Sequence, residues 1–129
     1  VLRHAAIMLA MQQAFWDKYK VGTKNNFKSP MDGKPTEKNP VLMDEKDGAP
    51  PEFASAGLDK QIAQGAIVLA CNLAFERCVG TVAKADKVAR DEARRVALTY
   101  LIPGVILQPS GVFAVTRAQE AGASYIKVS

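Results

Sequence analysis

The chain has 129 residues, of which 48% are hydrophobic and 23% charged, the composition of one ordinary globular domain. Its formal net charge of +4 is mild, and most lysines lie between residues 18 and 46 without the arginine clusters or interleaved aromatic residues of a nucleic-acid groove. Apolar runs are broken by Arg, Gln, Lys or Pro well before the roughly 20 residues that a bilayer requires. We therefore expect a single domain over residues 1–129, with no nucleic-acid partner and no membrane span.

The first expected element is a helix from Arg3 to Tyr19 that ends near Gly22. This stretch contains no Gly or Pro, and its apolar residues recur at steps of three and four along one side: Ile7, Ala10, Met11, Ala14 and Phe15. Before it, Val1 and Leu2 are expected to be the tail of a strand, part of a strand-helix-strand unit that is absent from this sequence. The three strands expected below would form a sheet with an exposed apolar edge, so something must cover that edge. The alternative to the missing unit is that another subunit covers it.

Residues 23–56 form a long connection that carries five of the seven prolines. Turns are expected at residues 31–34 and at Asp47-Gly48, where Asp and Gly follow the usual turn pattern. So long a segment is typical of a lid, a binding loop or an arm that bridges subunits. A catalytic lid and a solvated arm fixed only by oligomer contacts both remain open.

From Leu58 onward the pattern becomes a regular alternation of strands and helices. The apolar runs are continuous, as expected for parallel strands that are covered on both faces. A strand-helix-strand-helix-strand order predicts right-handed crossovers and a mainly parallel sheet. The expected helices cover residues 58–64, 73–85, 90–101 and 112–121, and the expected strands cover residues 66–70, 105–107 and 123–128.

Cys71 is the candidate reactive residue because it stands where an apolar strand ends and a helix begins. Open α/β sheets place ligands and chemistry at this carboxyl edge. The amides and the dipole of the following helix would stabilise a thiolate there. The alternative is a small structural cysteine, since cysteine is among the most buried residue types.

The other potentially reactive side chains are weaker candidates for a catalytic role than Cys71. Cys78 falls inside the apolar helix, as expected for an inert buried thiol, and too far along the axis to form a disulfide with Cys71. His4 is the only histidine, and it is either a base for Cys71 on the same rim or a capping or surface residue. Ser110 is interpreted as a helix cap. Neither metal-ligand spacing nor a Gly-rich nucleotide loop occurs, so we expect no metal and no cofactor.

Several short motifs together resemble the DsrE/DsrF-like sulfur-relay superfamily. Cys71-Asn72 before a helix is similar to that family's strand-end cysteine. The front of the chain resembles an exported, largely uncharacterised branch, with Arg3-His4 leading into a helix that ends in residues 15–22 and an arm that contains Asn39-Pro40. The remaining matches are Ile102-Pro103-Gly104-Val105, Pro109-Ser110-Gly111-Val112, residues 117–122 and Tyr125.

This resemblance implies an α/β, flavodoxin-like three-layer sandwich that lacks its N-terminal strand-helix-strand. In sulfur-transferring relatives the strand-end cysteine carries sulfane sulfur as a persulfide between a donor and an acceptor protein, a role that falls here on Cys71. Asn72 would position the loop, and His4 or Arg3 would assist. The resemblance also implies a trimer or hexamer and a periplasmic or exported location, with the cytoplasm as the alternative. A non-catalytic oligomeric binding or scaffold protein of the same fold is the competing hypothesis.

Overall fold

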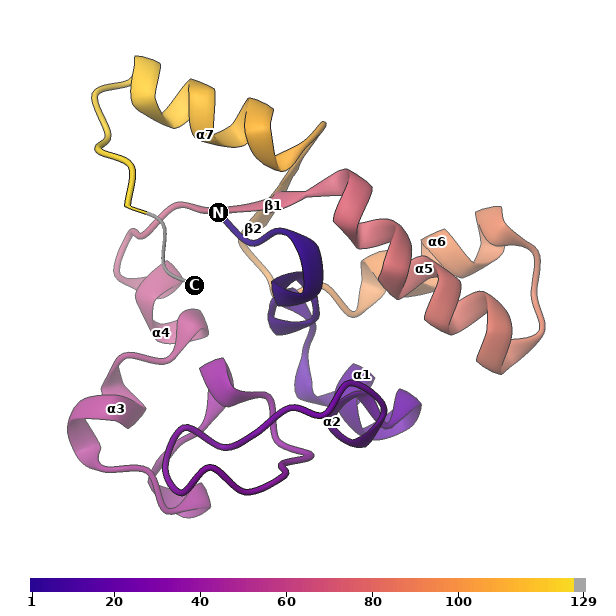
Figure 1. The fold of residues 1–129 in the computed structure, drawn as a ribbon, viewed down its shortest axis with the longest axis horizontal. Coiled ribbons are helices and arrows are strands. Elements are labelled where there is room, and N and C mark those ends of the chain that lie inside the picture. The colour runs from indigo at the N-terminus through magenta and orange to yellow at the C-terminus, as the bar shows by residue number, and fades with distance from the viewer. Residues whose placement is uncertain (127–129) are drawn as a thin grey trace.

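The computed structural model describes residues 1–126, which form a mixed α/β fold built around a small parallel sheet (Figure 1). Short 3-10 helices, labelled η, accompany the α-helices. In chain order the elements are η1 (His4–Ala10), α1 (Gln13–Tyr19), α2 (Val21–Lys24), η2 (Pro40–Leu42), η3 (Glu45–Asp47), α3 (Pro51–Ser55), α4 (Leu58–Ala63), β1 (Val68–Cys71), α5 (Asn72–Asp86), α6 (Arg90–Thr99), β2 (Val105–Gln108) and α7 (Gly111–Glu120).

The two strands run parallel, as the sequence predicts, and the chain crosses between them through α5 and α6. Their register places Val68 opposite Val105 and Cys71 opposite Gln108, so both strands end at the same edge. Leu2 extends the sheet on the other side of β1 through a single parallel bridge to Ala70. The prediction of a last strand over residues 123–128 is wrong for residues 123–126, which have no regular structure, and its remainder lies outside the described residues.

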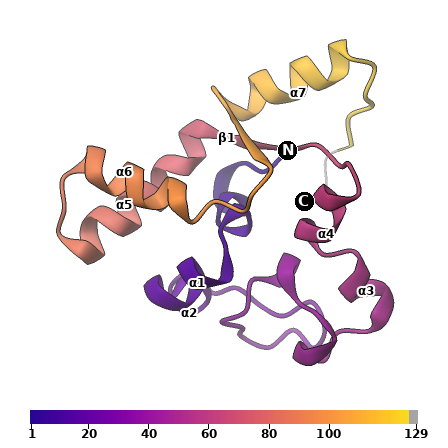
Figure 2. The same ribbon diagram turned by 180° about the vertical axis from the view of Figure 1, so that it is seen from behind.

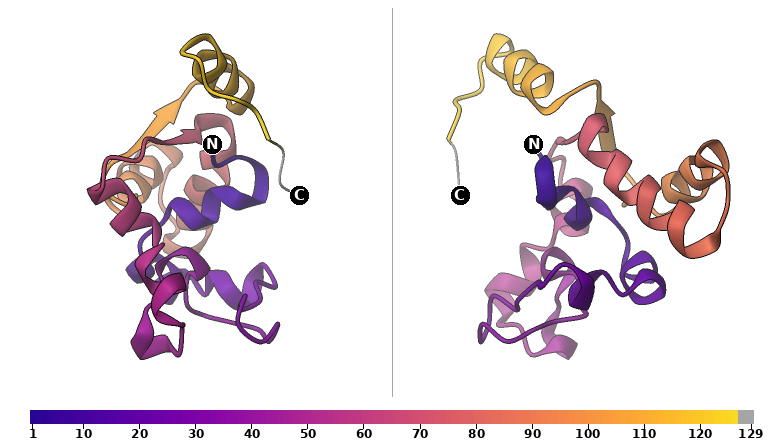
Figure 3. Two further views of the ribbon diagram at one scale, coloured as in Figure 1. Left: turned by 90° about the vertical axis from the view of Figure 1, so that its left-hand side faces the viewer. Right: turned by 45° about the vertical axis from the view of Figure 1, so that its right-hand side comes forward.

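The helices lie around the two strands and beyond their carboxyl ends. In Figures 1 and 3, α7 and η1 lie on opposite sides of β1, while α5 and α6 pack together as a pair beyond the end of the strand. Viewed from behind in Figure 2, the 23–56 arm with α3 lies at the bottom of the molecule, and α4 joins it to β1. The carboxyl edge of the sheet is therefore bordered by the first turns of α5 and α7.

The predicted single helix over residues 3–19 is wrong, because the chain breaks at Met11 and Gln12 between η1 and α1. Backbone pairing with residues 99–102 replaces the helical hydrogen bonds at this point. The Gln12 amide donates to the Tyr100 carbonyl at 2.8 Å, and the Gln12 side chain donates to the Leu101 carbonyl at 3.0 Å. Of the predicted apolar stripe, Ile7, Ala10, Met11 and Phe15 are buried and Ala14 is exposed.

The arm over residues 23–56 is folded against its own chain through Asn39, which is fully buried. The Asn39 side-chain amide donates to the Leu9 and Met11 carbonyls at 3.1 and 2.8 Å, and the Asn39 backbone N–H donates to Gln13 at 2.8 Å. The arm thereby satisfies the carbonyl groups that the break between η1 and α1 leaves without helical partners. Both predicted turns are present, with Gly33 and Gly48 in left-handed conformations. An arm fixed only by contacts with another subunit is not needed to explain this segment.

The main core lies between η1, α1, α5 and α6. Trp16 is fully buried and donates its indole N–H to the Met8 carbonyl at 2.8 Å. Tyr19 is buried as well, and its hydroxyl donates to Asp86 at 2.8 Å. These two aromatic side chains are therefore structural.

Candidate functional site

Cys71 is the last residue of β1 and the N-cap of α5. Its Sγ accepts a hydrogen bond from the Ala74 amide at 3.4 Å, so one of the free amides of the first helical turn points at the sulfur. The residue is buried, with 7% of its surface exposed, and it lines a cavity at the edge of the sheet. The cysteine therefore occupies the strand-end, amide-facing position that the sequence predicts.

A cavity of about 390 Å³ opens beside this sulfur. Arg3 and His4 enter it from the segment that follows Leu2, and Arg77 enters it from the second turn of α5. Ser110, the residue just before α7, also lines it. Besides these, its lining residues are Cys71, Leu73, Ala74, Gly111 and Val112.

The charges around the cavity are all of one sign. Arg3 and Arg77 line it, and no carboxylate does. The other four arginines of the chain, at positions 90, 94, 95 and 117, each form an ion pair with a glutamate, whereas Arg3 and Arg77 pair with no carboxylate within residues 1–126. A ligand would therefore not have to displace a carboxylate from either guanidinium group.

Two neighbouring residues shape the wall of the cavity next to α7. The Ser110 hydroxyl accepts a hydrogen bond from the Phe113 amide at 3.1 Å, which confirms the predicted N-cap. A Cβ at Gly111 would lie 2.9 Å from Cδ and 3.1 Å from Cβ of Arg3. Glycine at this position therefore lets the Arg3 side chain lie against the start of the helix.

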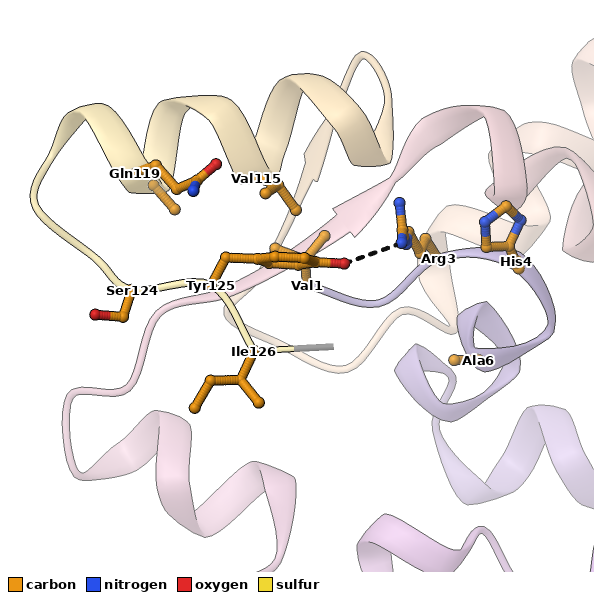
Figure 4. Close-up of a pocket in the computed structure, with 10 residues that line it drawn as sticks. Val1, Arg3, His4, Ala6, Val115, Gln119, Ser124, Tyr125 and Ile126 are labelled. Atoms are coloured by element: carbon orange, nitrogen blue, oxygen red, sulfur yellow. Dashed lines mark hydrogen bonds between the residues drawn. The ribbon is translucent and has the colours of Figure 1, made fainter. Parts of the chain in front are cut away.

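Arg3 and His4 also border a second cavity, of about 360 Å³, on the side of α7 that faces the C-terminal segment (Figure 4). Figure 4 shows the Tyr125 hydroxyl pointing toward Arg3, whose Nη2 donates to it at 3.3 Å. His4 is exposed and adopts a left-handed backbone conformation with φ of 53°. A residue other than glycine in this region costs roughly 1–2 kcal/mol, so the backbone at the cavity wall is strained.

The predicted site residue Asn72 does not join this group. Its side-chain oxygen accepts a hydrogen bond from Arg94 on α6 at 2.6 Å, and Arg94 also pairs with Glu76 at 2.9 Å. Asn72 thus helps to fasten α5 to α6 and is not among the residues that line the cavity. Of the four predicted site residues, Cys71, His4 and Arg3 meet at one cavity and Asn72 faces the neighbouring helix.

Cys78 has the opposite environment to Cys71. Its side chain is fully buried, and its Sγ lies 3.7 Å from the Met8 sulfur. Burial raises the pKa of the Cys78 thiol to about 12. The expectation of a buried thiol at this position is confirmed, and both cysteines are free.

Sequence reasoning missed Arg77 and the place of Ser110 beside the thiol. Helical spacing contained the signal for Arg77, because it follows Leu73 by four residues and Ala74 by three, and these positions share one face of a helix. The parallel register contained the signal for Ser110, since parallel strands end at the same edge and Ser110 begins the helix after β2. Neither signal was combined with Cys71 in the sequence interpretation.

Residues 1–126 contain no group of three or more His, Cys, Asp and Glu side chains placed to hold a metal ion. Over the same range, each helix is too short or too polar to cross a membrane. Comparisons with protein-family models, curated proteins and solved structures gave no significant match. The resemblance to the DsrE/DsrF-like superfamily consequently stays a prediction.

Proposed function

We propose that this protein is a sulfur carrier of DsrE-like, flavodoxin-like architecture that holds sulfane sulfur as a persulfide on Cys71. The observation that carries the proposal is the placement of the Cys71 sulfur at a cavity lined by Arg3, His4 and Arg77. Positive charge and helix N-terminal amides stabilise a thiolate, and the thiolate is the nucleophilic form of cysteine. Arg77 replaces Asn72 in the set of residues that we assign to the site.

The proposed step is a transfer of sulfur without net oxidation. The Cys71 thiolate attacks the terminal sulfur of a donor persulfide, R–S–SH, the donor S–S bond breaks, and the donor leaves as a thiolate with the electron pair. The new persulfide on Cys71 then loses its proton to solvent, and the same cations stabilise its negative terminal sulfur. An acceptor thiolate then attacks that terminal sulfur, and Cys71 departs as the thiolate.

The architecture supports this proposal in its coarse features. The strands are parallel and the cysteine stands at their carboxyl ends, which is where open α/β folds bind ligands. Leu73 and Val112 at the cavity remain 67% and 69% exposed, as expected for a surface that meets a donor or an acceptor protein. The trimeric or hexameric assembly and the periplasmic or exported location rest on the resemblance alone, and the cytoplasm stays the alternative.

A non-catalytic binding or scaffold protein is the second candidate. The observation in its favour is the limited accessibility of Cys71, which is only 7% exposed. In that case the cysteine would act as a packing residue and as the N-cap of α5, and the exposed apolar side chains would serve subunit contacts.

Persulfide loading separates the two candidates. The folded protein is treated with a low-molecular-weight persulfide, and the mass of each cysteine peptide is then measured. We expect a gain of one sulfur atom on Cys71 in the wild type and in Cys78→Ala, and no gain in Cys71→Ser. Sulfur on Cys78 alone, or no stable adduct on either thiol, would remove the carrier proposal and leave the scaffold.

A further inference from the structure

We propose that the cavity beside Cys71 is a binding site for a small, doubly charged oxyanion, held by Arg3 and Arg77. This goes beyond the carrier function, because the binding does not require the thiol. The ligand chemistry is that of a tetrahedral anion such as sulfate or phosphate.

The arginines are the first argument for this site. Arg3 and Arg77 come from segments far apart in the sequence, line one cavity and have no carboxylate partner within the described residues. Among residues 1–126 the Arg3 guanidinium donates only to the neutral Tyr125 hydroxyl, at 3.3 Å. Guanidinium groups present several donors in a planar fork that matches oxyanions, and such charge-assisted hydrogen bonds are about twice as strong as neutral ones.

The backbone around the cavity adds to the same preference. The first turns of α5, with 15 residues, and α7, with 10 residues, both line it. Each helix start carries a partial positive charge and amides without carbonyl partners inside the helix. Since Leu73 and Val112 lie in these turns, their amides are suitable reporters of an anion in the cavity.

The size and the composition of the cavity limit the ligand. At about 390 Å³ it lies near the lower end of the roughly 300–1,000 Å³ found for small-molecule sites. The lining contains no carboxylate that would repel a second negative charge or bind a cation, so the only anionic group at the cavity would be the Cys71 thiolate. A small dianion fits these features better than a cationic or neutral metabolite.

The test is a titration of the 15N-labelled full chain with sodium sulfate and, separately, with sodium phosphate, with sodium chloride at matched ionic strength as the reference. We expect saturable shifts of the Leu73 and Val112 amides with both oxyanions and not with chloride. In Arg77→Gln the affinity should fall about tenfold or more, as expected for the loss of a charge-assisted contact. Cys71→Ser should retain the binding, which separates this site from the persulfide chemistry.

A matched control is available on the same helix. Lys84→Gln removes an equal charge from an exposed position of α5 that does not line the cavity, and it should leave the affinity unchanged. Arg3→Gln serves as a second variant from a different segment, and it should weaken binding as Arg77→Gln does. Equal losses in Lys84→Gln and Arg77→Gln, or amide shifts that do not saturate, would overturn the proposal by showing only general charge attraction.

Discussion

The two sides of α5 differ in what surrounds them, although Arg77 and Cys78 are consecutive residues. The buried side carries Cys78, and no buried side-chain nitrogen or oxygen within residues 1–126 lacks a hydrogen-bond partner. The other side borders a cavity where Arg3 and Arg77 lack carboxylate partners and Leu73 stays exposed. Satisfied groups stabilise the fold, whereas unpaired groups at an accessible edge are available for binding. Substitutions in the buried interior should therefore alter the free energy of unfolding, and substitutions at the cavity should alter thiol reactivity or ligand affinity.

The largest expected difference is between the alkylation rates of the two thiols. With its pKa raised to about 12, Cys78 carries a thiolate in about one molecule in 10⁴ at pH 8, and its side chain is fully buried as well. Cys71 should react with iodoacetamide more than about 1,000-fold faster in the folded protein, as measured by peptide mass spectrometry. In denaturant the two rates should become equal. Comparable alkylation rates in the folded protein would mean that Cys71 is as inaccessible to the reagent as Cys78.

The next effect concerns the contact between α2 and the arm. A Cβ at Gly22 would overlap the Thr36 carbonyl oxygen and would lie 2.9 Å from the Glu37 Cα, both backbone atoms that cannot move alone. We expect Gly22→Ala to lower the free energy of unfolding by about 3–4 kcal/mol in a denaturant titration.

Gly80→Ala is the control for this substitution. Gly80 lies within α5, and an added Cβ meets nothing within 4 Å. Alanine in a helix interior is favoured over glycine by about 0.8–1 kcal/mol, so Gly80→Ala should stabilise the protein. If both variants shift stability in the same direction, the close packing of the arm against α2 is wrong.

Asn39 tests how firmly the arm is attached to the interior. Asn39→Ala removes two donors and leaves the Leu9 and Met11 carbonyls without these partners, which should cost about 2–3 kcal/mol of unfolding free energy. Asn25→Ala, which removes one hydrogen bond to the Val21 carbonyl at an exposed position, should cost under about 1 kcal/mol. If Asn39→Ala and Asn25→Ala cause equally small losses of unfolding free energy in thermal or denaturant unfolding, contacts other than those of Asn39 hold the arm.

The local signals in the sequence predict the second half of the fold well. The helix starts near Asn72 and Arg90, the cap at Ser110 and the parallel strands follow from apolar runs, capping residues and turn residues near each position. The predicted strand over 66–70 is shifted to Val68–Cys71, a change within the usual uncertainty of element boundaries.

The break at Gln12 and the anchoring of the arm are long-range effects. The Gln12 side chain bonds to residues 99 and 101, and the Asn39 amide bonds to carbonyls 28 and 30 residues earlier in the chain. Helical periodicity cannot reveal such partners, because it describes only neighbours within a few turns. At the candidate site, the sequence places Cys71, His4 and Arg3 at the same edge of the sheet, where they line one cavity. The contact of Asn72 with Arg94 could not be read from the sequence, because Arg94 lies 22 residues further along, on another helix.

The smallest expected effect on stability is that of Gly111→Ala, which is also the most specific test of the cavity beside Cys71. Gly111→Ala places a methyl group against the Arg3 side chain, which can rotate away, so the loss of stability should stay below about 1 kcal/mol. The displaced guanidinium would no longer be held against the start of α7, and oxyanion affinity in the amide titration should fall about threefold to tenfold. Gly80→Ala supplies the matched control, with unchanged affinity expected because Gly80 does not line the cavity and an added Cβ there meets nothing within 4 Å. If Gly111→Ala instead lowers the free energy of unfolding strongly and leaves the oxyanion affinity unchanged, Gly111 is needed for packing, and Arg3 has no role as an anion ligand.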